Sequence, residues 1–212
     1  MKTLDVPFIE GLAEMDDAAF LRALEESGAR FSVDQVGWPD DWPYCPETQG
    51  ASAHCNDGLA IRFHVRGFDL RAENLSDNGR QWEDSCCEFF VAGPAGYYNF
   101  EINCIGKILG AIGSQREERT RQEPKALERI RRVTSLPVAP VDRSGEICTW
   151  DVAVLIPYDL FGAVPNTVSL RANFYKCGDL TAHPHFVSWA PVNSPKPDFH
   201  RPDSFGELIL LP

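Results

Sequence analysis

Residues 86–104 read CCEFFVAGPAGYYNFEINC, two apolar runs on either side of a Gly-Pro-Ala-Gly turn. In the second run, one strand face would carry Tyr98, Phe100, Ile102 and Cys104, while polar residues alternate with them. A period of two is typical of a β-strand with one buried face. The turn residues favour a hairpin. We therefore predict two antiparallel strands, over 87–91 and 97–104.

The same period occurs in much of the chain. Residues 59–66 place Leu59, Ile61, Phe63 and Val65 inward and their polar neighbours outward. Further strands are predicted over 107–112, 148–156, 168–175, 185–189 and 206–210. Short helices are predicted over 16–26 and 123–131, and 34–58 is expected to be a long loop or an irregular strand. This pattern predicts a mainly all-β fold, an antiparallel two-sheet β-sandwich with one or two short peripheral helices.

The length of 212 residues suits one domain, and a 43% hydrophobic content suits a sizeable core. We expect residues 1–212 to form a single domain, with 1–28 as an N-terminal extension that carries a short helix. The N-terminus shows no targeting signal, and no run approaches the ~18 apolar residues of a membrane span. The expected location is cytoplasmic, or secreted if a leader was removed.

The formal net charge of −11 argues against partners that are nucleic acids or anionic membrane surfaces. The only basic cluster, residues 116–132, is interleaved with glutamates. We interpret it as a mixed-charge solvated helix rather than an anion site.

Seven cysteines occur, and no C-x-x-C spacing is present, so neither a zinc ribbon nor a redox motif is supported. Reduced thiols are the leading interpretation, and a Cys45–Cys55 bridge is the main alternative. Cys86 and Cys87 are adjacent in a predicted strand, so they should point to opposite faces.

Trp82 and several polar residues suggest a binding face. Counting back from the hairpin turn places Glu88 near Glu101 or Asn103, on a face that also carries Asn99. Sugar recognition uses an aromatic platform with carboxylate or amide groups that hydrogen-bond to hydroxyls. A solvated sheet face is the alternative interpretation.

Other candidate residues are weaker. Trp150 and Trp189 lie in strand patterns and should be core, whereas Trp38 and Trp42 could line a site. His183 with His185 is a poor metal-ligand set. Paired carboxylates could also serve glycoside hydrolysis, for which the candidates are Glu83, Asp84, Glu88 and Glu101. No G-x-S-x-G nucleophile motif occurs.

Residues 82–90, WEDSCCEFF, resemble the W-E-x-D-S-V-E-x-F signature of the family-nine carbohydrate-binding modules. Ser188-Trp189 and residues 201–208, RPDSFGEL, resemble the closing segment of that family, and 98–103 and 171–176 resemble its middle strands. The resemblance extends over roughly residues 30–212 and is closest to a divergent, free-standing branch.

The resemblance implies a β-sandwich of jelly-roll type that holds a mono- or oligosaccharide between two aromatic residues. Trp82 matches the first aromatic and Glu88 a sugar-binding carboxylate, while the second aromatic falls at Phe199 or at His200. A cationic sugar ligand of the family falls at Glu101, where the charge is reversed. Calcium is known in the family, but its ligands match no positions here.

We interpret the chain as a non-catalytic carbohydrate-binding domain rather than an enzyme, and we assign no catalytic residue. The expected site uses Trp82 as platform and polar and aromatic residues around it. The full set is Trp82, Glu88, Glu101, Asn103, Phe199, His200 and Arg201. The alternatives are a glycoside-active hydrolase and a structural or interaction sandwich with a decayed sugar site. The sequence indicates neither the sugar nor the oligomeric state.

Overall fold

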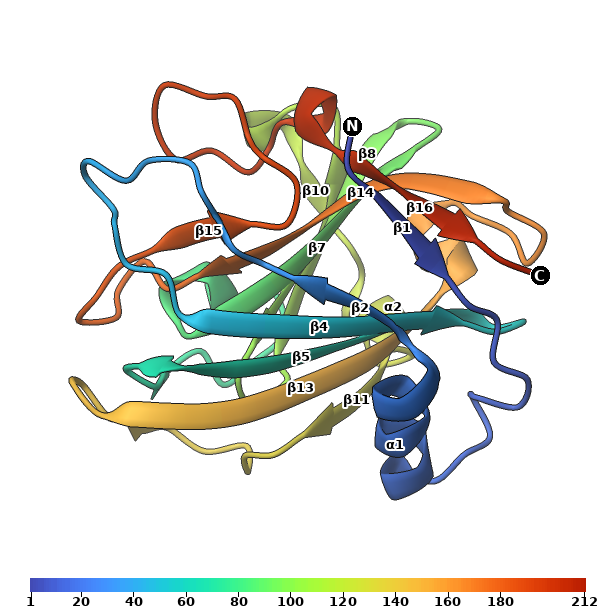
Figure 1. Cartoon of the computed structure of the whole chain (residues 1–212), viewed down its shortest axis with the longest axis horizontal. Helices are drawn as coiled ribbons and strands as arrows, with labels where there is room; N and C mark the ends of the chain where they lie inside the picture. The colour runs from blue at the N-terminus through green and yellow to red at the C-terminus, as the bar shows by residue number, and fades with distance from the viewer.

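A computed structural model describes residues 1–212 as two facing β-sheets (Figure 1). The larger sheet follows the order β1-β16-β14-β7-β8-β9-β10, and β15 pairs with β14 and β3 with β15. Its strands are β1 (Thr3–Val6), β3 (Gln35–Val36), β7 (Cys86–Gly93), β8 (Gly96–Asn103), β9 (Ile108–Gly113), β10 (Thr120–Arg121), β14 (Ser169–Cys177), β15 (Phe186–Ser188) and β16 (Gly206–Leu210).

The smaller sheet follows the order β11-β13-β5-β4-β2, and β12 and β6 form a separate pair. These strands are β2 (Ala29–Ser32), β4 (Glu47–His54), β5 (Gly58–Phe68), β6 (Arg71–Ala72), β11 (Arg131–Thr134), β12 (Val141–Asp142) and β13 (Ile147–Pro157). The helices are α1 (Asp17–Ser27) and α2 (Pro124–Leu127), with short 3-10 turns η1 (Gln81–Glu83), η2 (Arg116–Glu118), η3 (Tyr158–Phe161) and η4 (Pro202–Ser204). None of the helices has the length and apolar character needed to cross a membrane.

The predicted β-sandwich is confirmed, and its core lies between the two sheets. The inward face of β5 contributes Leu59, Ile61, Phe63 and Val65, as its alternation predicts. The facing sheet contributes phenylalanines, of which Phe89 and Phe174 stack with ring centroids 5.5 Å apart. Trp150 and Trp189 are buried in this core, also as predicted.

The predicted hairpin is confirmed as β7 and β8, joined through Pro94 and Ala95. Its register places Glu88 directly opposite Glu101, so both side chains leave the same face of the sheet. Cys86 and Cys87 point to opposite faces, since they belong to different hydrophobic clusters.

The prediction of a loop or irregular strand over 34–58 is wrong for its second half, where β4 pairs fully with β5. The sequence of β4 gives no strand signal, because the small residues of the segment GASA at 50–53 have little β propensity. They are small because they are covered: the Phe31 ring lies over Gly50, and helix α1 packs on Ala51 and Ala53.

The prediction of one solvated helix over 116–132 is also wrong. This segment contains η2, β10, the four-residue α2 and the first residues of β11. The helix predicted over 123–131 therefore ends at Leu127, because Arg131–Thr134 pairs with β13. Tertiary pairing here outweighs local helix propensity.

The N-terminal residues 1–28 pack into the sandwich. The strand β1 is parallel to β16 at an edge of the larger sheet, whereas the other strand pairs are antiparallel. Helix α1 covers the outer face of the smaller sheet (Figure 1), burying Phe20 and Leu24. The predicted boundaries of this helix hold: the Asp16 side chain caps its start, and Gly28 ends it.

All seven cysteines are free thiols, so the alternative Cys45–Cys55 bridge is wrong. Cys45 is exposed, whereas Cys55 is buried in the cluster under α1.

Candidate functional site

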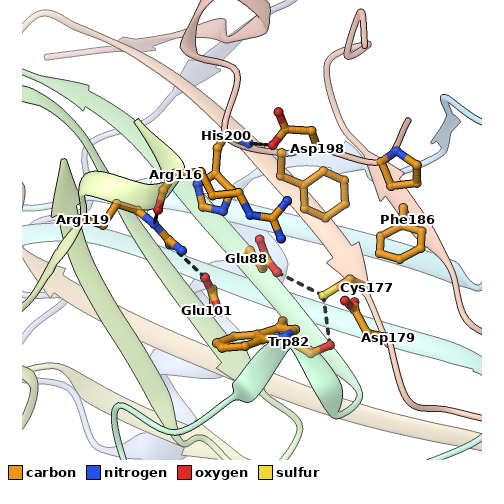
Figure 2. Close-up of a pocket in the computed structure, with 12 residues that line it drawn as sticks. Trp82, Glu88, Glu101, Arg116, Arg119, Cys177, Asp179, Phe186, Asp198 and His200 are labelled. Carbon is orange, nitrogen blue, oxygen red and sulfur yellow. Dashed lines mark hydrogen bonds and ion pairs between the residues drawn. The ribbon is translucent and has the colours of Figure 1, made fainter. Parts of the chain in front are cut away.

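A cavity of about 560 Å³, including its open mouth, lies on the outer face of the larger sheet. Its floor is formed by β7, β8 and the end of β14, and its walls come from loops. Figure 2 shows Glu88 and Glu101 at the floor, with Trp82 on one side and His200 on the other.

The floor carries Glu88, Glu101 and Cys177, whose side chains are buried. The Cys177 thiol donates to Glu88 Oε1 at 3.0 Å. The Asn99 amide donates to Glu101 Oε1 at 3.0 Å. Glu101 Oε2 and Asn99 Oδ1 are buried without a hydrogen-bond partner. Buried polar atoms are normally satisfied, so this carboxylate oxygen at the cavity floor is an acceptor that no protein group uses.

Two arginines from the loop after β9 form a cationic wall. Arg119 Nη1 lies 3.5 Å from Glu101 Oε1, and Arg116 reaches into the cavity beside it (Figure 2). These arginines belong to the basic cluster for which a solvated helix was predicted. The turn that η2 makes directs them toward the floor.

The Trp82 indole forms one aromatic wall. The 3-10 turn η1 positions it, and the chain after β14 holds this turn from the other side. The Asp179 N–H donates to Trp82 O at 3.1 Å, and the Leu180 N–H donates to Glu83 O at 3.2 Å. Trp82 is half-buried, so part of the ring faces the cavity.

The opposite wall is the loop that carries Asp198, Phe199 and His200. The Phe199 ring stacks on Tyr175 with centroids 4.2 Å apart, and the Tyr175 hydroxyl donates to Phe199 O at 3.2 Å. The Tyr97 hydroxyl and His200 Nδ1 are 2.8 Å apart and share a hydrogen bond. This segment is therefore held rigidly against the sheet.

Two further tryptophans support these walls from behind. Trp38 packs against Phe199 with centroids 6.4 Å apart, and Trp42 meets Phe186 edge-on at 5.3 Å. Of these four aromatic residues, only Phe186 and Phe199 line the cavity.

Burial shifts the ionisation of the site. It raises the pKa of Glu88 well above its usual range, and the nearby Glu101 carboxyl raises it further. It raises the pKa of Glu101 to about 7, although Arg119 opposes the increase. Burial also raises the pKa of Asp179 to about 6 and lowers the pKa of His200 to about 2. At neutral pH the floor is therefore less negative than its carboxyl groups suggest.

The structure brings five of the seven predicted site residues together: Trp82, Glu88, Glu101, Phe199 and His200 line the cavity. Asn103 does not, because its amide donates to Asp84 and to Asn74 O, and its oxygen accepts from the Lys107 N–H. Arg201 points away and pairs with Asp203 at 3.0 Å.

Seven further residues line the cavity although the sequence did not indicate them as site residues. Their full set is Arg116, Arg119, Cys177, Asp179, Phe186, Pro197 and Asp198. The loop residues have no periodicity that indicates direction. Cys177 and Asp179 lie within four residues of the end of the strand predicted over 168–175, and this position was the one available signal.

The remaining hydrolase candidates do not line the cavity. Glu83 pairs with Arg80 at the surface. The buried Asp84 carboxylate accepts from the N–H groups of Glu73 and Asn74, so it holds the β6–η1 connection in place.

The model of carbohydrate-binding family 9 matches residues 20–210. The chain belongs to carbohydrate-binding family 9. A Bacteroides uniformis structure, described as a "putative carbohydrate-binding protein", has 34% sequence identity and a TM-score of 0.92, with 99% of each chain covered. No curated protein matches.

Two family 9 module structures from Caldicellulosiruptor kristjanssonii are more distant. The complex with glucose has 13% identity and a TM-score of 0.59, and covers 99% of this chain and 96% of the module. The complex with cellotriose has 14% identity and a TM-score of 0.52, and covers 99% and 93%. At these identities the likeness concerns the fold.

Calcium, known in family 9, remains without assigned ligands. Calcium takes six to eight oxygen ligands. Here Asp69 and Asp84 accept from backbone N–H groups, and Asp77 pairs with Arg132 at 2.7 Å. The carboxylates of these three residues are therefore engaged by nitrogen donors in this structure.

The two histidines considered as metal ligands are also engaged. His183 Nδ1 lies 2.9 Å from Asp69 Oδ2. His185 Nε2 lies 2.7 Å from the Lys176 ammonium, which donates to it. Both side chains thus have structural partners.

Proposed function

We propose that the cavity binds a mono- or oligosaccharide without cleaving it. The observation that carries this proposal is the combination of an indole wall with a buried carboxylate floor, in which Glu101 Oε2 lacks a partner. A sugar presents both complements: an apolar C–H face for an aromatic ring and hydroxyl groups that donate to carboxylates. Membership of family 9 supports the same class of ligand.

Trp82 is the proposed stacking platform, and Phe199 and Phe186 contribute apolar surface on the other walls. Because the Phe199 ring is stacked on Tyr175 and the backbone of Trp82 is held by the Asp179 N–H, the walls would need little rearrangement on binding. This preorganisation favours a small ligand that fits between the walls.

The polar groups of the cavity would form hydrogen bonds with the sugar hydroxyls. Glu101 Oε2 offers an acceptor, and Arg119 and Arg116 offer N–H donors. Burial raises the pKa of Glu88 well above its usual range, and its carboxyl oxygens offer further acceptors on the floor. Asn103 and Arg201, which do not line the cavity, are not part of this proposed ligand set.

A glycan array with the purified protein, with and without calcium, tests the proposal. Glucose and cellotriose, present in the Caldicellulosiruptor complexes, are the first compounds to include. We expect saturable binding of at least one saccharide class. A folded protein that binds no glycan would contradict the proposal and favour a structural or interaction role.

Glycoside cleavage is the second candidate, because Glu88 and Glu101 are directly opposed carboxyls with raised pKa values. Such a pair could divide acid and base roles between them. Turnover of aryl glycosides that is lost in Glu88→Gln would favour this candidate. The absence of turnover across a panel of sugars that do bind would favour binding alone.

A further inference from the structure

The floor of the cavity holds a second cluster of chemical groups, on the side toward β14. Cys86 and Cys177 are directly paired residues of β7 and β14, and Glu88 lies two residues along β7 on the same face. The two sulfur atoms and one Glu88 oxygen all lie within 4.8 Å of one another. Figure 2 shows the Cys177 sulfur and the Glu88 carboxyl side by side.

We infer that Cys86, Cys177 and Glu88 form a binding site for a thiophilic divalent cation of the Zn²⁺ class. Zinc takes sulfur at about 2.3 Å and carboxylate oxygen at about 2.0–2.2 Å in a tetrahedron, which places two sulfur ligands ~3.8 Å apart. The three ligand atoms, which lie within 4.8 Å of one another, are near enough for one such ion to contact them all after side-chain adjustment. Two thiolates and a carboxylate suit zinc and do not suit calcium, which prefers oxygen.

The sheet preorganises this site. All three residues are on paired strands, which restricts their backbone movement more than a loop would. The three side chains are buried, with exposed fractions of 0% for Cys86, 1% for Cys177 and 3% for Glu88. Cation binding would release to the solvent the two thiol protons and any proton held by Glu88, and would replace the thiol–carboxyl hydrogen bond with three coordination bonds.

The cavity supplies the entry path and the fourth position. Cys177 and Glu88 line the cavity, whereas Cys86 lies behind them and does not. A bound cation would therefore have three protein ligands and one face open to the cavity, where water or another oxygen donor completes the tetrahedron. The two binding events share this floor, but the metal inference does not depend on sugar binding.

Titration of the reduced, metal-free protein with Co²⁺ tests the inference, because tetrahedral thiolate ligation gives a charge-transfer band and intense visible absorption. We expect one Co²⁺ per chain, displaced by Zn²⁺ and not by Ca²⁺. Loss of a group that only hydrogen-bonds to a metal ligand typically costs 10–100-fold in metal affinity, so loss of a ligand itself in Cys86→Ser or Cys177→Ser should cost more than about 100-fold. Cys148→Ser, a buried cysteine of β13 in the smaller sheet, should bind like the wild type.

Wild-type protein without a thiolate band, or an unchanged band in Cys86→Ser, would overturn the inference. If the serine variants do not fold, the rate of cysteine alkylation in the wild-type protein, with and without metal, tests the site instead. Saturating Zn²⁺ should then protect Cys177, and equal alkylation with Zn²⁺ and with Ca²⁺ would refute the site. Cys86→Ser also separates the two proposals, since it should lose the metal while metal-free sugar binding is retained.

Discussion

At the scale of single residues, the floor of the cavity depends on two carboxyls that face each other across β7 and β8. Their alternation with inward residues was visible in the sequence, and counting from the hairpin turn narrowed the partner of Glu88 to Glu101 or Asn103, of which the register selects Glu101. Arg119 was not predictable as their neighbour. It comes from a turn whose direction depends on tertiary contacts and on no repeating pattern.

The first prediction concerns Glu101→Gln and the pH dependence of stability. Burial raises the pKa of Glu101 from 4.5 to about 7, so the folded state binds this proton more tightly than the unfolded state. The free energy of unfolding should therefore fall as pH rises from about 4.5 to about 7, by an amount of the order of 3 kcal/mol. Urea unfolding at several pH values should show a smaller decrease in Glu101→Gln than in the wild type, because Glu88 and Asp179, whose pKa values burial also raises, remain.

The matched control is Glu146→Gln, at an exposed carboxyl, which should keep the wild-type profile. Parallel wild-type and Glu101→Gln profiles between pH 4.5 and 7 would contradict the prediction.

The second prediction concerns Arg119, whose guanidinium lowers the pKa of Glu101. Arg119→Gln should raise that pKa above about 7, by about 1 pKa unit, because the carboxylate loses its nearby cation. Carboxyl titration followed by NMR measures this change. Arg80→Gln, at an exposed arginine that pairs with Glu83, should leave the pKa of Glu101 unaltered. The same pKa in both variants would show that Arg119 does not act on this carboxyl.

At the scale of elements, strands with regular alternation were predictable and strands built from small residues were not. The alternation in β5 and β8 reports a sheet with one buried face, which follows from local sequence. The residues of β4 are small because the Phe31 ring and helix α1 occupy the space above them. That reason lies in other elements, so the segment alone does not contain it.

The third prediction tests this close approach at Gly50. A Cβ there would lie 2.1 Å from the Phe31 ring, which cannot retreat because it stacks on Phe174 at 4.1 Å. Gly50→Ala should therefore lower the free energy of unfolding by about 1–3 kcal/mol. In Gly37→Ala, whose new Cβ meets its nearest atom at 3.8 Å, the change should stay within about 0.5 kcal/mol. Equal unfolding midpoints for the two variants would refute the account of β4.

At the scale of the whole molecule, the N-terminal helix α1 covers the outer face of the smaller sheet. The larger sheet uses its outer face for the cavity, and the smaller sheet covers its outer face with α1. The sequence predicted the helix from its cap and its apolar face but gave no indication of where the helix docks. The docking depends on the alanines of β4 and β5, whose small size leaves room for it.

The fourth prediction tests the docking of α1. Leu24 is fully buried against the smaller sheet, so Leu24→Ala should leave a cavity and lower the free energy of unfolding by about 2–5 kcal/mol. Glu26→Ala, an exposed change on the same helix, should alter it by less than about 0.5 kcal/mol. Denaturant unfolding measures both, and a Leu24→Ala protein as stable as Glu26→Ala would mean that α1 does not stabilise the sandwich.

The central claim is that the cavity binds a sugar against Trp82. Isothermal titration calorimetry with the saccharide that the array identifies, on wild type, Trp82→Ala and Phe68→Ala, tests it most directly. Phe68 is an exposed aromatic that does not line the cavity, so its variant controls for general loss of aromatic surface. Trp82→Ala should weaken binding at least ~30-fold, the cost of losing a hot-spot tryptophan, while its circular dichroism stays native. Wild-type affinity in a folded Trp82→Ala protein would contradict the claim.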